Sequence, residues 1–254
     1  MMAARERRAA KKSGSGSGAK SPQNELDQMI KKANKLAAPT IQAAGAISFL
    51  YASYWQLMVV KVPLNLAPNR DKFGGVLKYL TFLNMVLQFV FFTVALLANF
   101  SGKRSRLVRV RDVMFASAAF PIGMFVGLVF WGLWAIDREL IFPVALDAHF
   151  PSWLNHLMHT TVLPLQVMEL FLVRHTYPSR RVGGAITAAL TLAYLIWINV
   201  IAYYGGFWVY PVFKVLTVGQ RVVVMALLSG VGGLLYLAGE AANRVVWPPR
   251  ARAE

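Results

Sequence analysis

Four polar side chains lie on one face of a predicted helix in an otherwise apolar segment of this 254-residue chain. Within residues 153–173, Asn155, His159, Gln166 and Glu169 fall at positions i, i+4, i+11 and i+14. That spacing places all four on the same helical face. Polar groups are costly at membrane depth and must be paired or used there. This face is therefore where function should be sought.

A second polar stripe lies in residues 77–100, where Thr81, Asn84 and Gln88 fall at i, i+3 and i+7. These three side chains also share one face of a helix. Because a polar face avoids lipid, we expect both stripes to point into a helix bundle.

The depths of the two stripes agree if both helices enter the membrane from the outer side. Thr81 lies four residues past Leu77, about 6 Å along a helix, and His159 lies six past Trp153, about 9 Å. A hydroxyl and an imidazole at matching depth on two inward faces can be neighbours. A threonine hydroxyl becomes a nucleophile when a base takes its proton, and imidazole is such a base near neutral pH. The chemistry predicted for this pair is acyl transfer that ends in ester hydrolysis.

The same residues also have ordinary structural explanations, which spacing alone leaves open. Thr81 can donate a hydrogen bond to a carbonyl of its own helix, as buried threonines commonly do. His159 can be a hydrogen-bonding group between helices. The candidates for substrate binding or for stabilising an oxyanion are Asn84, Asn155, His156 and Thr160.

The same polar residues bear on two other kinds of site. A metal site built on His156 and His159 is not expected, because no second helix supplies a histidine or cysteine ligand. We expect no organic cofactor either. Glu169 and Gln166 would line the path of a small transporter or channel, which is one alternative function, although Glu169 can instead pair with Arg174. A non-catalytic membrane regulator is the other alternative.

The composition explains which elements must hold these residues. Apolar residues make up 57% of the chain and charged residues 15%, against roughly 45–50% and about 25% in soluble domains. The charges are also segregated, so that uncharged runs approach the roughly 20 residues that a helix needs to cross a bilayer. The chain has no cysteine, which excludes disulfides and thiolate chemistry. An ordinary soluble domain is excluded.

We expect an all-α polytopic membrane protein, a bundle of six transmembrane helices. The predicted spans are residues 40–60, 77–100, 113–136, 153–173, 184–204 and 220–243. The predicted organisation is a disordered basic Ser/Gly tail over 1–23, an amphipathic helix on the membrane surface over 24–38, a transmembrane domain over 39–245 and a cytosolic tail over 246–254. Pro121 and Pro164 should kink the third and fourth spans.

The distribution of positive charge predicts the orientation. With six spans, most of the 27 lysine and arginine residues fall on the side that holds both termini, so we expect both termini in the cytosol. The net charge of +16 lies in a tail and short loops rather than on a folded face. We therefore expect contacts with the bilayer and with anionic lipid head groups at the N-terminal tail, and not with nucleic acid. The membrane is predicted to be the plasma membrane or the endoplasmic reticulum.

Several sequence stretches resemble a known family of multipass membrane proteins, the androgen-induced and androgen-dependent tissue-factor-pathway-inhibitor-regulating proteins. The stretches are GGVLKYLTFLN (74–84), RDVMFASAAFPIGMFVGLVFW (111–131), DREL-IFP (137–143), PSWLNHLMHTTVLP (151–164), HTYPSR (175–180), WVYPVF (208–213) and LLYLAGE (234–240). The resemblance covers about residues 45–245 and does not reach the Ser/Gly tail.

The resemblance implies a threonine hydrolase that cleaves fatty acid esters of hydroxy fatty acids. The family's nucleophile lies in a motif matched here by Thr81, and its essential histidine is matched by His159. The family often has Asp where this chain has Asn84, so no catalytic carboxylate is assigned there. The expected protein is an intramembrane hydrolase with a lipid-accessible pocket in the outer half of the bundle.

Overall fold

The computed structural model describes residues 22–66, 69, 71–102 and 104–248, with side chains from residue 35 onward. The chain separates into two units, residues 1–36 and 37–254, and the packed helices belong to the second. The tail predicted over 1–23 lies outside the described residues, apart from Pro22 and Gln23, which begin a helix. The predicted C-terminal tail is likewise described only up to residue 248.

Helix α2 (Pro22–Met58) continues without interruption from the predicted surface helix into the first predicted span. Pro39 lies inside it, although proline removes a hydrogen bond from a helix interior. Alanine, leucine and lysine, which favour helix, flank the proline on its N-terminal side. The position of the first part of α2 on the membrane surface stays a prediction.

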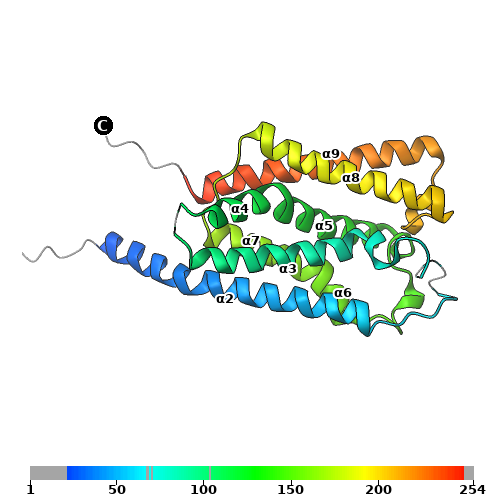
Figure 1. Ribbon diagram of the computed structural model, residues 1–254, viewed down its shortest axis with the longest axis horizontal. Coiled ribbons are helices and arrows are strands. Elements are labelled where there is room, and N and C mark those ends of the chain that lie inside the picture. The colour runs from blue at the N-terminus through cyan, green and yellow to red at the C-terminus, as the bar shows by residue number, and fades with distance from the viewer. Residues whose placement is uncertain (1–21, 67–68, 70, 103, 249–254) are drawn as a thin grey trace, which may run out of the picture. The chain divides into compact units, whose positions relative to one another are not determined.

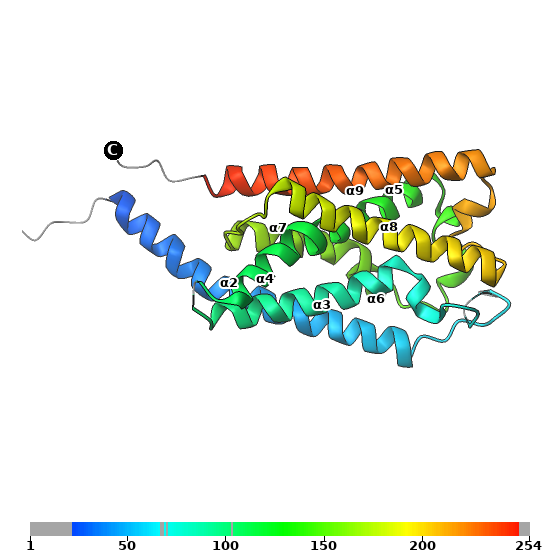
Figure 2. The same ribbon diagram turned by 45° about the horizontal axis from the view of Figure 1, so that its top comes forward.

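The other helices overlap the predicted spans, and their ends agree to within a few residues except at the start of the third, which begins at Arg106 rather than at residue 113. They are α3 (Leu80–Asn99), α4 (Arg106–Met114), α5 (Phe120–Asp137), α6 (Ser152–His156), α7 (Val162–Leu172), α8 (Arg180–Gly205) and α9 (Val218–Val246). In Figures 1 and 2, helices α3, α5, α8 and α9 run lengthwise beside one another. Helix α5 packs against α3, α7 and α9, and α9 packs against α8. No strand occurs in the part of the chain that the structure describes.

Four helical segments are long and apolar enough to cross a membrane. They are Leu80–Asn99, Arg106–Leu140, Arg180–Gly205 and Val218–Val246. The six-span prediction is therefore supported for its second, third, fifth and sixth members. The first predicted span lies within α2, and the fourth corresponds to residues 152–172. Neither is among the four segments that are long and apolar enough. The fourth is helical throughout, but the polar face that suggested a site also lowers its hydropathy.

Both of the prolines predicted to kink spans follow a π-helical turn. Phe115–Ala119 is π-helical just before Pro121, and Leu157–Thr161 is π-helical just before Pro164. Proline has no N–H and clashes with the carbonyl four residues earlier, so the helix widens there. At Pro121 that carbonyl belongs to Ser117, and it accepts a hydrogen bond from Thr187 Oγ1 of α8 at 2.9 Å.

The core of the second unit is formed by packed aromatic and small side chains. Phe49, Phe91, Phe92 and Phe115 are fully buried between the helices. In contrast, only 17% of the most apolar stretch of α8, and the same share of α9, is buried within the molecule. Among the four candidate spans of the described residues, α8 and α9 therefore have the least buried apolar stretches, as expected of helices that face lipid.

Candidate active site

The structure brings the two candidate catalytic side chains together. Thr81 is the second residue of α3, and His159 lies in the π-helical turn between α6 and α7. Thr81 Oγ1 and His159 Nε2 are 3.3 Å apart, although the residues are 78 positions apart in the chain. This distance is within reach of a hydrogen bond between a nucleophile and its base.

The other ring nitrogen of His159 determines which nitrogen carries the proton. His159 Nδ1 lies 3.0 Å from the backbone oxygen of Asn155 and 2.9 Å from its side-chain oxygen. A backbone carbonyl can only accept, so Nδ1 must donate. In a neutral imidazole, Nε2 then holds a free lone pair. This lone pair faces the Thr81 hydroxyl and can take its proton.

Packing holds the imidazole in this orientation. The ring of His159 is only 4% exposed. It stacks on Phe130 of α5, with ring centroids 3.5 Å apart and planes 9° apart. Gly127, one turn before Phe130 on α5, lets the backbones of α5 and of the π-helical turn lie close together. A Cβ at this position would lie 2.7 Å from the His159 carbonyl oxygen. The imidazole is therefore held in place by residues of α5 and α6.

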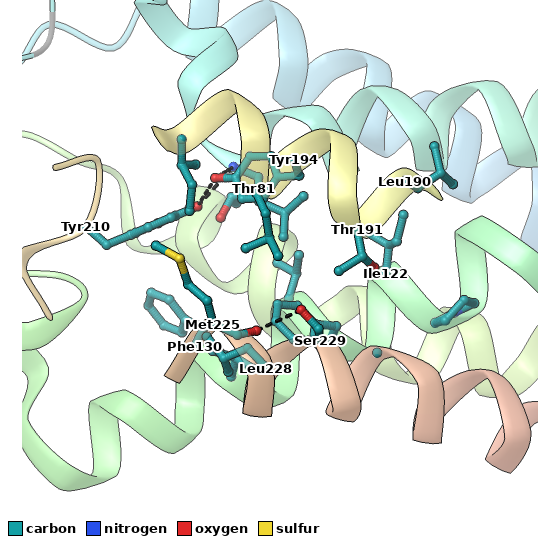
Figure 3. Close-up of a pocket in the computed structure, with 18 of the residues that line it drawn as sticks. Thr81, Ile122, Phe130, Leu190, Thr191, Tyr194, Tyr210, Met225, Leu228 and Ser229 are labelled. Carbon is teal, nitrogen blue, oxygen red and sulfur yellow. Dashed lines mark hydrogen bonds between the residues drawn. The ribbon is translucent and has the colours of Figure 1, made fainter. Parts of the chain in front are cut away.

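Thr81 lies in the wall of an apolar pocket of about 140 Å³. The pocket is bounded by side chains of α3, α5, α8, α9 and the segment that connects α8 to α9. Among the described residues, no charged side chain lines it. In Figure 3, Thr81, Tyr194 and Tyr210 lie close together, while Ile122 and Leu190 lie farther along the pocket. A hydrocarbon chain suits this lining, and an ionised group does not.

The remaining candidates from the sequence lie around the pair without lining the pocket. Asn155 orients His159 through the two contacts of Nδ1. Asn84 lies one turn along α3 from Thr81, and its side-chain oxygen accepts a hydrogen bond from Gln88 at 2.9 Å. His156 is exposed, stacks on Trp131, and has its Nδ1 3.0 Å from Thr160 Oγ1. The interactions of Asn84, His156 and Thr160 are therefore with residues outside the pair.

Gln166 and Glu169, the residues considered for a transport path, are fully buried and bonded to neighbouring helices. Gln166 Nε2 donates to Gln88 Oε1 at 2.5 Å. Gln42 Nε2 of α2 donates to both Glu169 oxygens, at 3.0 and 2.9 Å. Neither Gln166 nor Glu169 lines the apolar pocket. Glu169 bonds with Gln42 in place of the Arg174 partner considered from the sequence. Within the described residues, no group of three or more His, Asp or Glu side chains could hold a metal ion.

Two tyrosines beside Thr81 were not identified from the sequence as site residues. Tyr194 lies in α8, and Tyr210 lies in the connection to α9. Tyr210 lies in the connection between α8 and α9, where residue spacing gives no indication that its side chain reaches the pocket. Tyr194 carries the only signal available beforehand, a hydroxyl in an apolar span.

Known proteins match most of the chain. A family model described as FAR-17a/AIG1-like protein matches residues 41–244. The androgen-induced gene 1 protein of Homo sapiens is 36% identical over 200 residues, which cover 74% of this chain and 84% of that protein. The androgen-dependent TFPI-regulating protein of Rattus norvegicus is 37% identical over 205 residues, covering 78% and 88%. Its counterpart in Homo sapiens is 38% identical over 180 residues, covering 68% and 78%. No solved structure matches the chain.

Proposed function

Because this chain belongs to the FAR-17a/AIG1-like protein family, we propose that it is an intramembrane hydrolase of fatty acid esters of hydroxy fatty acids. Thr81 is the nucleophile and His159 is the base. The observation that carries the proposal is the 3.3 Å contact between Thr81 Oγ1 and His159 Nε2, made by a threonine that lines an apolar pocket.

The reaction has two halves, each with balanced proton transfers. Thr81 Oγ attacks the ester carbonyl carbon as His159 Nε2 takes the hydroxyl proton, and the carbonyl π electrons move onto the oxygen. When that tetrahedral intermediate collapses, the alcohol leaves with the proton that His159 held, and an acyl-Thr81 ester remains. Water then attacks this ester with His159 again as base. The acid is released and the Thr81 hydroxyl is restored.

The apolar pocket supports a lipid ester as the substrate. An acyl chain that enters it replaces water with the apolar side chains of α5, α8 and α9. Each buried methylene contributes roughly 0.8 kcal/mol. The carboxylate of a hydroxy fatty acid has no cationic partner among the residues that line this pocket. We therefore expect the unsubstituted acyl chain to occupy the pocket and the hydroxy-acid portion to extend away from it.

Turnover by purified variants tests the proposal. Thr81→Ala and His159→Ala should each lose at least about 100-fold in kcat, the lower end of what a positioned acid or base contributes. A fluorophosphonate probe should label the wild type and not Thr81→Ala. Thr93→Ala is the matched control, because Thr93 lies on the same helix and donates only to the Phe89 carbonyl of α3. Wild-type turnover by folded Thr81→Ala or His159→Ala would exclude this pair.

A non-catalytic regulator is the second candidate, and the names of the relatives favour it. The similar proteins of Rattus norvegicus and Homo sapiens are named as TFPI-regulating. A chain that acts by binding a partner needs no nucleophile. If the Thr81→Ala variant keeps a regulatory effect in cells while it fails to cleave ester, then regulation by this chain is independent of hydrolysis.

A further inference from the structure

Two tyrosine hydroxyls meet at the end of α3 that carries Thr81. The Tyr194 and Tyr210 oxygens are 2.8 Å apart. Each lies 3.0 Å from the backbone nitrogen of Leu80, whose N–H both of them accept. Leu80 directly precedes Thr81, and all four residues line the same pocket. Figure 3 shows both tyrosines beside Thr81. The hydroxyl pair is therefore held at the residue next to Thr81.

The protons of this pair can be arranged in two ways. In the first, Tyr194 donates to the Lys78 carbonyl at 3.0 Å, and Tyr210 donates to Tyr194. In the second, Tyr194 donates to Tyr210, which leaves the Tyr210 proton free for an acceptor in the pocket. The two differ by rotation of two hydroxyl groups, which is a small change. An oxygen that gains negative charge favours the second arrangement, because charge strengthens the hydrogen bond that it accepts.

An ester carbonyl attacked by Thr81 develops such a charge in this part of the pocket. Its oxygen lies two covalent bonds from Thr81 Oγ once the tetrahedral intermediate forms. The two tyrosines are the pocket-lining hydroxyls that share the Leu80 N–H next to Thr81. The N–H of Thr81 itself belongs to the first turn of α3, where N–H groups lack an acceptor within the helix. The candidate donors are therefore located at Thr81 itself and at the residue before it.

We propose that Tyr210 is a catalytic residue that donates a hydrogen bond to the ester carbonyl oxygen as its negative charge develops, and that Tyr194 is a positioning residue that orients and polarises Tyr210. This rests on the proposed hydrolase function. No proton is transferred from either tyrosine. The charge that forms on the carbonyl oxygen returns to the carbonyl bond when the alcohol leaves, and the Tyr210 proton then turns back to Tyr194.

Two features of Tyr210 suit it to this role. Burial raises the pKa of its phenol above the usual range, so the hydroxyl keeps its proton at neutral pH. The hydroxyl is also not required to cap α3, because the Leu80 N–H has Tyr194 as a second acceptor. Removing the Tyr210 oxygen therefore leaves the helix end satisfied, and the loss of activity can be separated from a loss of structure.

The test uses full-length protein reconstituted in lipid nanodiscs, with Tyr210→Phe and Tyr194→Phe beside the wild type. One oxyanion donor contributes about 100- to 1000-fold to kcat. Tyr210→Phe should lose a factor of this order, with KM changed by no more than about threefold. Tyr194→Phe should lose less, and the double variant should resemble Tyr210→Phe, because the two groups act as one unit. Tyr204→Phe, an exposed tyrosine near the end of α8, is the matched control.

A pair of inhibitors distinguishes charge stabilisation from a structural role. An alkyl trifluoromethyl ketone adds the nucleophile to form an oxyanion, whereas its alcohol analogue cannot. Tyr210→Phe and, to a smaller extent, Tyr194→Phe should weaken binding of the ketone and leave binding of the alcohol within about threefold. Equal weakening of both compounds, or wild-type kcat in Tyr210→Phe, would overturn the proposal. In the same assay, an active Thr81→Ala variant would instead identify the nucleophile assignment as the error, and the role of Tyr210 would fall with it.

Discussion

Replacing Asn155 with alanine tests how the base is held. The His159 Nδ1–H faces two acceptors, the Asn155 side-chain oxygen at 2.9 Å and the Asn155 backbone oxygen at 3.0 Å. Substitution removes only the first. The backbone carbonyl remains and still requires Nδ1 to donate, so Nε2 stays the proton acceptor. The variant should keep the correct tautomer and lose part of the restraint on the ring.

The size of the expected fall in kcat depends on how many acceptors the His159 Nδ1–H keeps. A hydrogen bond contributes about 0.5–1.5 kcal/mol net, and each 1.36 kcal/mol is tenfold in rate. Losing one of two acceptors should therefore lower kcat by about 2- to 13-fold. Deleting the imidazole in His159→Ala should cost about 100-fold or more. Ester turnover by purified, folded protein measures both, and a gap of about eightfold or more should separate them.

The matched control is Asn199→Ala. The Asn199 side chain donates to the Leu195 carbonyl, four residues earlier in α8, at 2.7 Å; it is exposed, and its helix carries neither Thr81 nor His159. Its turnover should stay within about twofold of wild type. A fall above 100-fold in folded Asn155→Ala would show that the side chain, and not the backbone, sets the tautomer. An unchanged kcat would show that the side-chain oxygen does not restrain the ring.

Two further substitutions examine the packing that holds the site. Gly127→Ala should lower stability by about 1–3 kcal/mol, because its Cβ would lie 2.7 Å from the His159 carbonyl oxygen. Gly132→Ala on the same helix has open space for its Cβ and should not lower the thermal midpoint. Thr187→Val should lower the free energy of unfolding in urea by about 1–3 kcal/mol, because it removes the hydroxyl that donates to the Ser117 carbonyl. An unchanged urea midpoint would show that this hydrogen bond does not stabilise the helix at Pro121.

Most of the helices could be predicted because the signals for them are local. Long uncharged runs predict helices that cross a membrane, and α3, α5, α8 and α9 lie where those runs lie. Helical periodicity also placed polar residues on shared faces. The same signals were less informative for residues 152–172, because a polar face reduces the apolar character by which a span is recognised.

The candidate pair could be predicted in part. Spacing indicated that Thr81 and His159 share a depth, and the resemblance to a known family pointed to the same two residues. The role of Asn155 in orienting the ring could not be separated beforehand from a role in binding the oxyanion. That choice depends on the rotation of one side chain against its own backbone, for which residue spacing carries no information.

The amino-acid sequence by itself determined where the helices lie and which of their faces are polar, because both depend on interactions between residues a few positions apart. Only the tertiary structure decided which faces meet. It brought Thr81 Oγ1 within 3.3 Å of His159 Nε2, although the two residues are 78 positions apart. It also brought the Tyr194 and Tyr210 hydroxyls together, where both accept the N–H of Leu80. Such meetings depend on how whole helices pack, where small residues such as Gly127 set how closely two backbones approach.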